Sequence, residues 1–472
     1  MRVPFSEYLW PMKDGFKPFS HQVEIVKFLL KNKRAFNLSD LGTGKTLSHL
    51  WTADFLMIND KIKQALIITP LSTMRSVWAN EIFTHLPHRR YRIAHGTKDE
   101  RLYAINSNAD FLILNHDGVS IAEVEKAIIQ KINRGDIGLV IIDELTAYKK
   151  HTTNRTKAMI RISHALGHKG GLHGATAAPT PNSPTEAFGQ AKVVNPFNPL
   201  VPRYFKQFEA SVEVKLGPFV TMPLPGAEQR VGEALSPAIR FNRDECIDIP
   251  PCQYLTHIVQ ITDEQRAAYK KMKEELLIEH SSGLITASNA AVKVMKLLQI
   301  SAGSVKDDNG NSLKLDSSNR DEFLWNLFEQ TGKTKLVVAS AFRADILHLK
   351  EFFGKRKVKA EVIYGDVKHD TRAAHIKNFQ EGDLQVLIIQ PQSAAHGITL
   401  TAACDLVWYS LVASGEIHLQ FNGRITRAGQ TRKQRIHYLI GTQAEKRVLG
   451  ILNGKERMST SVLEMFEEMK PN

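Results

Sequence analysis

The sequence of 472 residues predicts an α/β protein made of two tandem, doubly wound parallel-sheet lobes with small helical insertions between them. Three observations support this fold class. Short apolar segments alternate with helical stretches in two separate blocks, as in strands that are buried on both faces of a parallel sheet. A glycine-rich turn follows the first apolar segment, and two carboxylates follow another. Each block is long enough to form one lobe.

Apolar segments mark the expected strands of both sheets. In the first block they are residues 34–38, 65–69, 110–114 and 138–142. In the second block they are residues 335–339, 360–364, 385–389, 405–409 and 435–440. Each is five or six residues long, and most are rich in Val, Ile and Leu, which is typical of parallel strands.

The domain boundaries follow from the segments between these blocks. We expect lobe one over residues 1–245 and lobe two over residues 311–472. A proline-rich stretch predicts an irregular insertion in lobe one at about residues 190–240. Helical periodicity and a stiff Pro-Pro boundary predict that residues 246–310 form a linker and a helical protrusion leading into lobe two.

Composition restricts the partners and the compartment. Lys and Arg number 62 against 49 Asp and Glu, and the net charge of +13 favours a polyanionic partner such as nucleic acid. Cys246, Cys252 and Cys404 fit neither a disulfide framework nor a zinc site, so we expect free thiols in a reducing compartment. The sequence shows no long apolar run and no signal-peptide core, so we expect an intracellular protein without a membrane span.

The glycine-rich turn predicts a phosphate-binding loop. It stands between a strand and a helix N-terminus, where backbone N–H groups point at an anion. Lys45 would reach the terminal phosphates, and the Thr46 hydroxyl would hold Mg²⁺. Ser39 stands where the general pattern has glycine, so the loop is of the variant type Asp-x-Gly-x-Gly-Lys-Thr. The other loop residues expected around ATP are Asp40, Leu41, Gly42, Thr43 and Gly44.

Two carboxylates and a glutamine complete the expected nucleotide site. Asp143 and Glu144 follow the strand 138–142, and parallel strands deliver such residues to the ligand crevice. Asp143 would bind Mg²⁺ through water, and Glu144 would orient and deprotonate the attacking water. Gln22 starts an amphipathic helix, and its amide matches the donor and acceptor edge of adenine. The sequence contains no convincing guanine-reading motif, which favours ATP over GTP.

The motifs together resemble the superfamily two helicases and, within them, the Swi/Snf-type DNA-dependent ATPases. They follow the family's order from about residue 18 to residue 445, with the last motif at residues 420–430. The resemblance implies two RecA-like lobes, ATP and Mg²⁺ as cofactors, and duplex DNA as a partner that is bound without regard to sequence. Leu145 and Thr146 replace the family's usual Ala-His, so the link between the ATP and DNA sites differs here.

The resemblance also assigns residues outside the phosphate loop. It places Gln420 at ATP and assigns coupling between the lobes to Thr176, Pro179 and Gln430. Candidate contacts to the DNA backbone are Ser72, Thr73, Asn115, Ser340, Phe342, Arg372, Ser393 and Thr401. Such contacts to phosphates carry no base information.

Arg424 and Arg427 are the expected arginine fingers of lobe two. They lie three residues apart on an expected helix, so both would face the same way. A guanidinium stays charged and binds phosphate oxygens with a fixed fork. Such a finger contributes about 10³–10⁵ in rate in other nucleotide hydrolases.

These features predict a motor that hydrolyses ATP and translocates along double-stranded DNA, remodelling DNA or DNA–protein complexes. The alternatives are a strand-separating DNA or RNA helicase and, from another class, a DNA-binding module whose ATPase has decayed. We expect a monomer in a bacterial or phage-infected cytoplasm, or in the nucleus of a eukaryote. The pathway, the step size, the polarity and the protein partners do not follow from the sequence.

Overall fold

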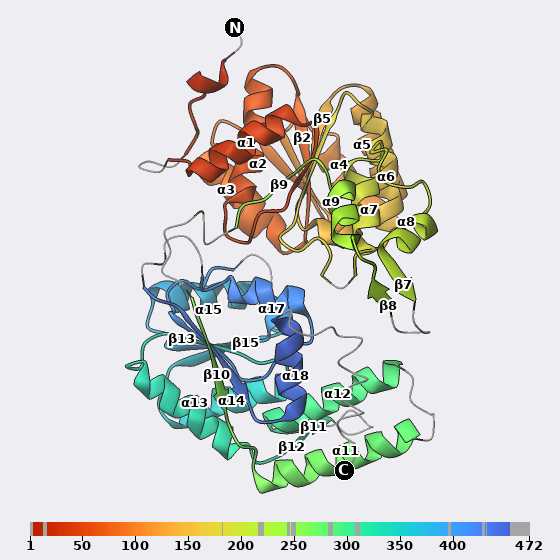
Figure 1. Ribbon diagram of the computed structural model, residues 1–472. Coiled ribbons are helices and arrows are strands. Elements are labelled where there is room, and N and C mark those ends of the chain that lie inside the picture. Colours follow the sequence, from red (N-terminus) through yellow and green to blue (C-terminus); the bar gives the residue numbers. More distant parts are fainter. Residues whose placement is uncertain are drawn as a thin grey trace. The chain divides into compact units, whose positions relative to one another are not determined.

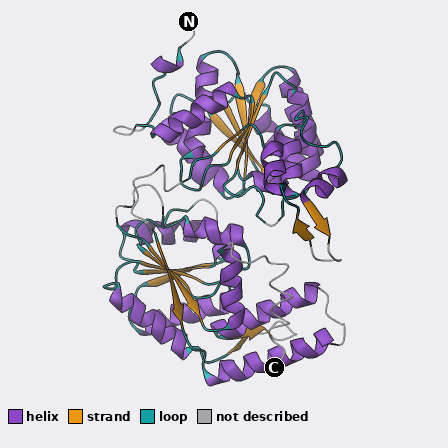
Figure 2. Cartoon of the chain, in the orientation of Figure 1, coloured by secondary structure: helices purple, strands orange, loops and turns teal. Residues whose placement is uncertain are grey.

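The computed structural model describes residues 3–12, 17–181, 183–215, 221–242, 246, 252–281, 287–306, 312–394, 398–426, 430 and 432–453. The chain divides into two compact units, which we call unit 1 (Met1–Lys215 with Thr221–Asp248) and unit 2 (Leu216–Val220 with Ile249–Asn472). Each unit contains a parallel sheet with helices packed on it (Figure 1; Figure 2). The predicted fold class is therefore confirmed.

The sheet of unit 1 has seven described strands in the order β3-β4-β2-β5-β6-β1-β9, all parallel. Their bounds are β1 (Arg34–Asn37), β2 (Gln64–Thr69), β3 (Tyr91–Ala94), β4 (Phe111–Asn115), β5 (Ile137–Ile142), β6 (Gly171–Ala175) and β9 (Ala238–Ile239). The order reverses between β1 and β2, because β1 lies beyond β5 and β6 while β2 lies beside β4. Ligands of doubly wound sheets bind beyond the carboxyl ends of the strands at such a switch.

Both faces of this sheet are buried, which explains the near-continuous apolar strands. Leu66 and Ile68 of β2 belong to one hydrophobic cluster, whereas Ala65 and Ile67 belong to another. The first face is covered by α4 (Lys98–Ile105), α5 (Ala122–Asn133), α6 (Asn154–Leu166) and α7 (Glu186–Val194). The second is covered by α2 (Lys45–Ile58) and α3 (Asn80–His85), with α1 (Ser20–Lys31) beside α2.

The insertion of unit 1 is more regular than the sequence predicts. It contains α8 (Phe205–Val212), α9 (Ala227–Ala234) and an antiparallel pair, β7 (Glu213–Lys215) with β8 (Thr221–Pro223). Phe208 and Val212 of α8 and Ala227 of α9 are buried in the same cluster as α7. Prolines punctuate this stretch but leave room for short elements, and tertiary packing stabilises them.

The sheet of unit 2 has six described strands in the order β10-β17-β16-β13-β15-β14, again all parallel. Their bounds are β10 (Gln253–Ile258), β13 (Leu336–Ala339), β14 (Ala360–Ile363), β15 (Val386–Ile389), β16 (Asp405–Trp408) and β17 (Arg435–Ile440). β10 comes from the segment expected to be a linker, and its side chains alternate between half-buried and exposed. This alternation at a sheet edge lacks the continuous apolar run that marks central strands.

Helices surround the second sheet, and a small pair of antiparallel strands follows α12. The helices are α11 (Asp263–Ser281), α12 (Ala287–Ala302), α13 (Ser318–Gln330), α14 (Arg343–Lys355), α15 (His369–Glu381), α16 (Pro391–Ala394), α17 (Gly415–Asn422) and α18 (Gln443–Leu452). β11 (Ser304–Lys306) and β12 (Ser312–Lys314) form the pair. Among the described helices, none is long and apolar enough to cross a membrane.

Candidate active site

The phosphate-loop candidate lies between β1 and α2, at the carboxyl edge of the sheet. Gly42 and Gly44 have φ angles of 83° and 75°, which glycine adopts without steric cost. The Lys45 ammonium donates to the backbone oxygens of Ser39 at 2.7 Å and Asp40 at 2.9 Å. α2 begins at Lys45, so the N–H groups of its first turn border the loop. Backbone donors, a helix N-terminus and an ammonium together suit a polyphosphate.

The start of α1 packs directly on this loop. Gln22 is buried; its Oε1 accepts from Phe19 N at 3.0 Å, and its Nε2 donates to Gly44 O at 3.4 Å. His21 Nε2 lies 2.9 Å from Thr43 O, and since a carbonyl only accepts, this nitrogen carries the proton. Burial lowers the pKa of His21, which favours the neutral ring. The sequence indicated Gln22 but not His21, which precedes it.

A buried polar cluster lies beneath the loop, where the sequence indicated only ordinary packing. Asn37, the last residue of β1, accepts from Ser39 N at 3.3 Å, and its Nδ2 lies 3.5 Å from His49 Nε2. His49 stands one helical turn after Lys45, and its ring lies 5.9 Å from that of His173. Burial lowers the pKa of His49 well below its usual value, with smaller effects of His173 and Lys45. Burial also lowers the pKa of His173, to about 4.

The acidic strand end of β5 is tied to β2 and to the segment after it. Asp143 Oδ2 accepts from the Trp78 indole at 2.9 Å and from the Thr69 hydroxyl at 3.3 Å. The Thr69 and Thr73 hydroxyl oxygens are 2.6 Å apart, and since the single Thr69 proton is donated to Asp143, the Thr73 hydroxyl donates to Thr69 Oγ1; Pro70 O lies 2.9 Å from Thr73 Oγ1. Glu144 N donates to the other carboxylate oxygen, Asp143 Oδ1, at 3.1 Å. The Asp143 carboxylate is therefore oriented by three donors, from Trp78, Thr69 and Glu144.

Glu144 has an unusual backbone for its residue type. Its φ of 50° and ψ of 58° are left-handed, a conformation that costs a non-glycine residue about 1–3 kcal/mol. It stands directly before the 3₁₀ turn Leu145–Tyr148, whose Leu145 and Tyr148 are buried. The buried turn holds Glu144 in this conformation, and such strain in a native structure is characteristic of functional sites.

The residues assigned to Mg²⁺ suit this ion chemically. Thr46 and Asp143 offer a hydroxyl and a carboxylate, which are the hard oxygen ligands that Mg²⁺ prefers. Within the described residues there is no group of three or more His, Cys, Asp or Glu side chains that could hold a metal by itself. In nucleotide sites Mg²⁺ usually keeps several waters and takes further ligands from the phosphates.

The candidate DNA contacts of unit 1 occupy different environments. Ser72 is exposed on the loop after β2, whereas the hydroxyl of its neighbour Thr73 is buried in the network around Asp143. Asn115, at the end of β4, is 9% exposed, and its Oδ1 accepts from Arg101 at 2.8 Å. Ser72 is thus the most accessible of the three, and all three remain predictions as DNA contacts.

The predicted coupling residues of unit 1 follow β6. Thr176 N donates to Asn37 O at 3.1 Å, which joins this segment to the residue before the phosphate loop. The Thr176 hydroxyl accepts from Ala178 N at 3.3 Å. Pro179 O accepts from the buried Gln190 of α7. The segment is therefore anchored on both sides within unit 1.

The candidate DNA contacts of unit 2 are mostly engaged in internal bonds. Ser340 is fully buried and shares hydrogen bonds with Ser410 at 2.8 Å and Asp345 at 3.1 Å. Arg372 donates to Ser393 O at 2.8 Å, so these two assigned residues lie together. Phe342 is buried at the start of α14. Thr401 is half-buried, and its hydroxyl accepts a hydrogen bond from Gln380. Burial of Ser340 favours a supporting role over direct contact with a ligand.

The last motif differs from the sequence-based expectation. α17 ends at Asn422, so Arg424 lies in the turn after the helix and not on it. Its guanidinium is buried and donates to Ile398 O at 3.3 Å. The C-cap residue, Gly423, has a right-handed backbone with φ −63° and ψ −4°, so the helix ends without the left-handed turn that glycine often provides. Arg427 lies outside the described residues, so the expected common face of the two arginines stays a prediction.

The two glutamines of this motif have separate roles in the packing. Gln420, on α17, is 4% exposed, and its Nε2 donates to Glu416 at 3.4 Å. Its Oε1 has no hydrogen-bond partner within the described part of the chain, which leaves an acceptor for a ligand. Gln430 donates to Thr401 O at 3.0 Å and Ala403 O at 2.9 Å, so it fixes the loop before β16.

The chain has two parallel-sheet units. One of them has a phosphate loop that ends in a lysine and two carboxylates at the end of a strand of the same sheet. This combination is typical of two-lobed proteins that hydrolyse ATP. The chain belongs to the SNF2-related family. The SNF2-related domain matches residues 21–313, and the helicase conserved C-terminal domain matches residues 319–429. The resemblance found in the motifs is confirmed, and the protein is an ATP-dependent, helicase-like enzyme.

Curated relatives cover most of this chain. Protein p41 of Acyrthosiphon pisum secondary endosymbiont phage 1 is 26% identical over 96% of this chain and 99% of its own length. The ATP-dependent helicase MG018 of Mycoplasma genitalium is 24% identical over 93% of this chain, and the human DNA annealing helicase and endonuclease ZRANB3 is 23% identical over 93%. The chain spans only 41% and 40% of these two longer proteins.

One solved structure shows the same two-lobed fold. Dbp5 of S. cerevisiae, bound to RNA and ADP BeF3, aligns with a TM-score of 0.53 and 14% identity over 96% of this chain and 94% of its own. The Sulfolobus solfataricus SWI2/SNF2 ATPase core in complex with dsDNA aligns with a TM-score of 0.45 and 19% identity over 97% and 96%. The likeness to Dbp5 supports the two-lobed architecture.

Proposed function

We propose that this protein is a motor that hydrolyses ATP with Mg²⁺ in order to move along double-stranded DNA without reading its sequence. The observation that carries the proposal is the hydrogen-bonded chain from Asp143 through Thr69 to Thr73. It joins the carboxylate assigned to the metal to the loop that exposes Ser72. A change at the nucleotide is thereby transmitted to a segment that can hold a DNA backbone.

The proposed chemistry divides between the units. In unit 1, Lys45 and the loop N–H groups bind the phosphates, Asp143 and Thr46 hold Mg²⁺, and Glu144 takes the proton of the attacking water. In unit 2, Arg424 and Arg427 supply positive charge to the γ-phosphate. Mg²⁺ would neutralise charge that develops on the phosphate oxygens. Hydrolysis then requires the arginines to reach a nucleotide bound on unit 1, which links each ATP to one cycle of closure and opening.

The substrate assignment rests on charge and on family. The net charge of +13 favours a polyanion, and backbone contacts bind without sequence preference. The Sulfolobus relative is a complex with dsDNA, and ZRANB3 is named as a DNA annealing helicase. We therefore infer duplex DNA as the track, with a monomer in the cytoplasm of a bacterial or phage-infected cell as the working form.

ATP turnover should be measured without nucleic acid and with single-stranded DNA, duplex DNA or RNA. We expect the largest stimulation by duplex DNA, and we expect Lys45→Ala and Glu144→Gln to abolish turnover while DNA binding persists. Displacement of the third strand of a triplex without release of strands from a fork supports translocation. Strand release from a fork supports the helicase alternative, and absence of turnover under every condition supports the decayed module.

A further inference from the structure

The two edges of the sheet in unit 1 carry opposite charge. The three residues that precede each of β1 to β6 include two Asp and eight Lys or Arg, which are Lys31, Lys33, Lys61, Lys63, Arg89, Arg90, Arg134 and Lys169. The three residues that follow each strand include no Lys or Arg and four carboxylates: Asp40, Asp117, Asp143 and Glu144. Because the strands are parallel, each set lies along one edge. We call the eight basic residues the basic rim.

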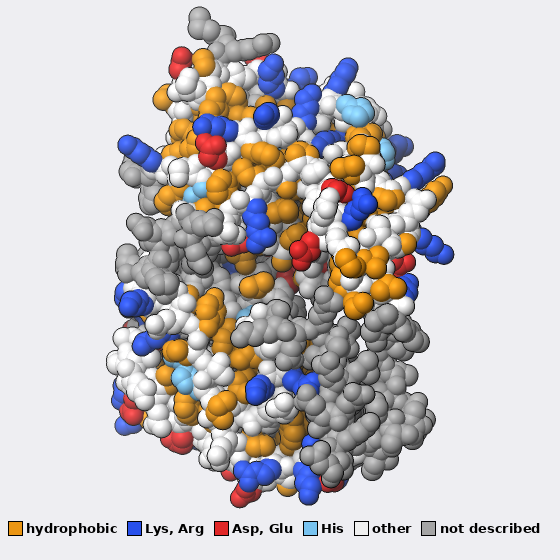
Figure 3. All heavy atoms as spheres, viewed as in Figure 1, with side chains coloured by type: hydrophobic (Ala, Val, Ile, Leu, Met, Phe, Trp, Pro, Cys, Tyr) orange, Lys and Arg blue, Asp and Glu red, His pale blue; other side chains and the backbone are white. Residues whose placement is uncertain are grey.

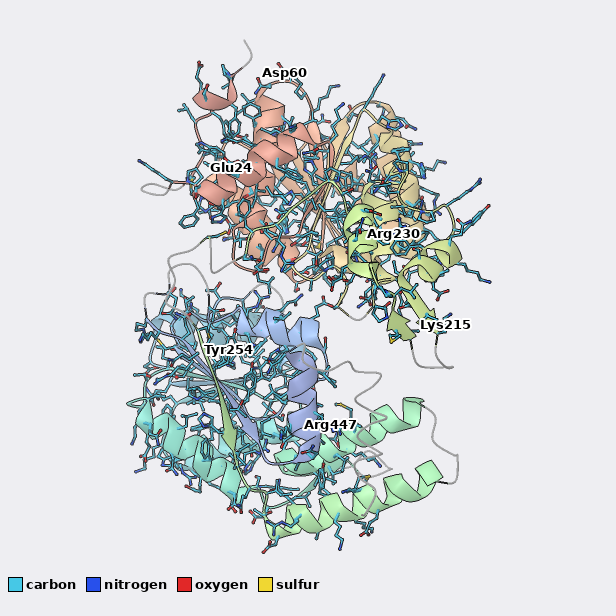
Figure 4. All side chains as sticks on the ribbon, in the orientation of Figure 1. Glu24, Asp60, Lys215, Arg230, Tyr254 and Arg447 are labelled. Atoms are coloured by element: carbon cyan, nitrogen blue, oxygen red, sulfur yellow. The ribbon has the colours of Figure 1, made fainter. Side chains whose placement is uncertain are left out.

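Half of the basic rim has no compensating charge. Arg89 pairs with Asp54 at 2.6 Å and Arg90 with Asp110 at 3.7 Å. Lys63 and Arg134 approach Asp136 at 3.8 Å and 3.7 Å. Four exposed members have no ion pair within the described residues: Lys31, Lys33, Lys61 and Lys169. Figure 3 shows Lys and Arg side chains gathered at the end of unit 1 where Figure 4 labels Asp60, which lies between α2 and β2. The rim is therefore a net positive surface.

A pocket lies at the β3 end of the rim. It has a volume of about 410 Å³ and is lined by Arg89, Arg90, Tyr91, Arg92, Ser107 and Asn108. Arg92 is exposed and makes no ion pair within the described chain, so its guanidinium is available to a ligand. A guanidinium binds a phosphate through two parallel hydrogen bonds, so this pocket suits a phosphodiester group.

Helix dipoles explain only part of this charge. Residues before a strand follow a helix, and a cation near a helix C-terminus is stabilising within the last turn. Lys31 is in the last turn of α1, but Lys33, Lys61 and Lys169 lie beyond the ends of their helices. Three strands are preceded by two cations each, and at least one of each pair lies beyond the last turn of the preceding helix, where the dipole effect has fallen off. The remaining charge points to an external anion.

The geometry of the rim fits an extended polyanion. β3 and β1 are separated by five strand intervals, which span about 24 Å at about 4.8 Å each. One DNA strand carries a phosphate about every 3.4 Å, so roughly seven phosphates extend over this distance. The rim is separated from the phosphate-loop edge by the length of β2, about 20 Å for its six residues. It is thus distinct from the surface that would hold the tracked DNA.

We infer that the basic rim is a second nucleic-acid-binding surface, which holds the phosphodiester backbone of a separate duplex segment while the motor moves along the first. This inference rests on the proposed function for the first segment. With two segments held, ATP-driven stepping displaces one duplex relative to the other, as in the extrusion of a loop or the approach of two distant sites.

The test uses the full chain and a charge-matched control. The rim variant carries Lys31→Gln, Lys33→Gln, Lys61→Gln and Lys169→Gln. The control carries four changes elsewhere in unit 1: Lys27→Gln, Lys126→Gln, Lys206→Gln and Lys215→Gln. A bead-bound duplex and a second, fluorescent duplex report bridging by the protein, with duplex RNA as a second probe in a parallel arm. Duplex-stimulated ATP turnover and the salt dependence of binding are measured on the same samples.

We expect the rim variant to lose bridging at least tenfold and to keep ATP turnover on one short duplex within twofold of wild type. The slope of log affinity against log salt for a long duplex should become shallower by about three to four, since each phosphate contact contributes about 0.9. The control should match wild type. Absence of bridging by wild type, or equal loss in both variants, overturns the inference. Bridging that depends on the rim in a protein without DNA-stimulated turnover would instead reject the proposed motor and retain the rim.

Discussion

The side-chain amide of Gln22 occupies the space in which a Cβ on Gly44 would stand. A Cβ built there would lie 2.1 Å from Gln22 Nε2, and the φ of Gly44 is +75°. The residue assigned to adenine and the residue before Lys45 therefore depend on each other. The phosphate loop and the start of α1 form one site, although 21 residues separate Gln22 from Gly44.

Gly44→Ala should weaken ATP binding at least tenfold. The methyl group displaces Gln22 from the loop, and a left-handed alanine adds a backbone cost of about 1 kcal/mol. Nucleotide titration by fluorescence or calorimetry measures the effect. Gly232→Ala is the control, since its Cβ meets nothing within 4 Å on α9, and it should leave ATP affinity unchanged. Equal affinity of Gly44→Ala and wild type would contradict the assignment of this loop.

Trp78→Phe should lower the ATP turnover rate by about tenfold with little effect on DNA affinity. The change keeps an aromatic ring in the buried site but removes the N–H that donates to Asp143 at 2.9 Å. A hydrogen bond to a charged group contributes about 1.5–3 kcal/mol, and about 1.4 kcal/mol corresponds to tenfold in rate. Steady-state kinetics with saturating duplex DNA measure it. An unchanged turnover rate would show that Asp143 needs no support from this indole.

Unit 1 should lose stability as the pH falls from about 6.5 towards 4. Burial lowers the pKa of His173 from 6.5 to about 4, so between these values the unfolded chain binds a proton that the folded unit does not. The shift corresponds to about 3 kcal/mol at the lower end of this range. Urea unfolding at a series of pH values measures it. His173→Gln should show a shallower dependence, and an identical slope in the variant would exclude His173 as the cause.

Removal of the carboxylate of Glu445 should destabilise unit 2 by about 3–5 kcal/mol. Glu445 and Arg320 form an ion pair of 2.8 Å with side chains 1% and 2% exposed, so Glu445→Ala leaves a buried, unpaired guanidinium. Denaturant unfolding of unit 2 measures the change. Glu329→Ala is the matched control, because its pair with Lys333 is exposed and should contribute less than about 1 kcal/mol. Similar losses in both variants would contradict this distinction.

Local sequence was sufficient for the elements that bury both faces of a sheet. The segments around Ile67, Ile113, Ile141 and Val338 are continuous apolar runs, and each forms a central parallel strand. The places of Gly44 and Lys45 in the phosphate loop could also be predicted from the sequence. A backbone with positive φ favours glycine, and the lysine stands at a fixed spacing from it at the start of the helix. Such local rules fixed the fold class and the phosphate loop.

Other features depended on residues that are distant in the chain. β10 is a strand because it pairs with β17, which lies 182 residues later in the chain. The insertion is ordered because Phe208 packs in the same hydrophobic cluster as α7. Trp78 reaches Asp143, and Asn37 meets His49 and Thr176, through contacts that no local pattern encodes. Arg424 lies outside the expected helix, since α17 ends at Asn422.

The sequence by itself determined the order of the motifs, the two-lobed class and the chemistry of the loop, because each depends on neighbours within a few positions. Only the tertiary structure decided which side chains orient Asp143, how deeply Ser340 and Arg424 are buried, and that one edge of the first sheet is basic. Parallel packing sets these properties, since it brings the ends of separate strands to a common edge.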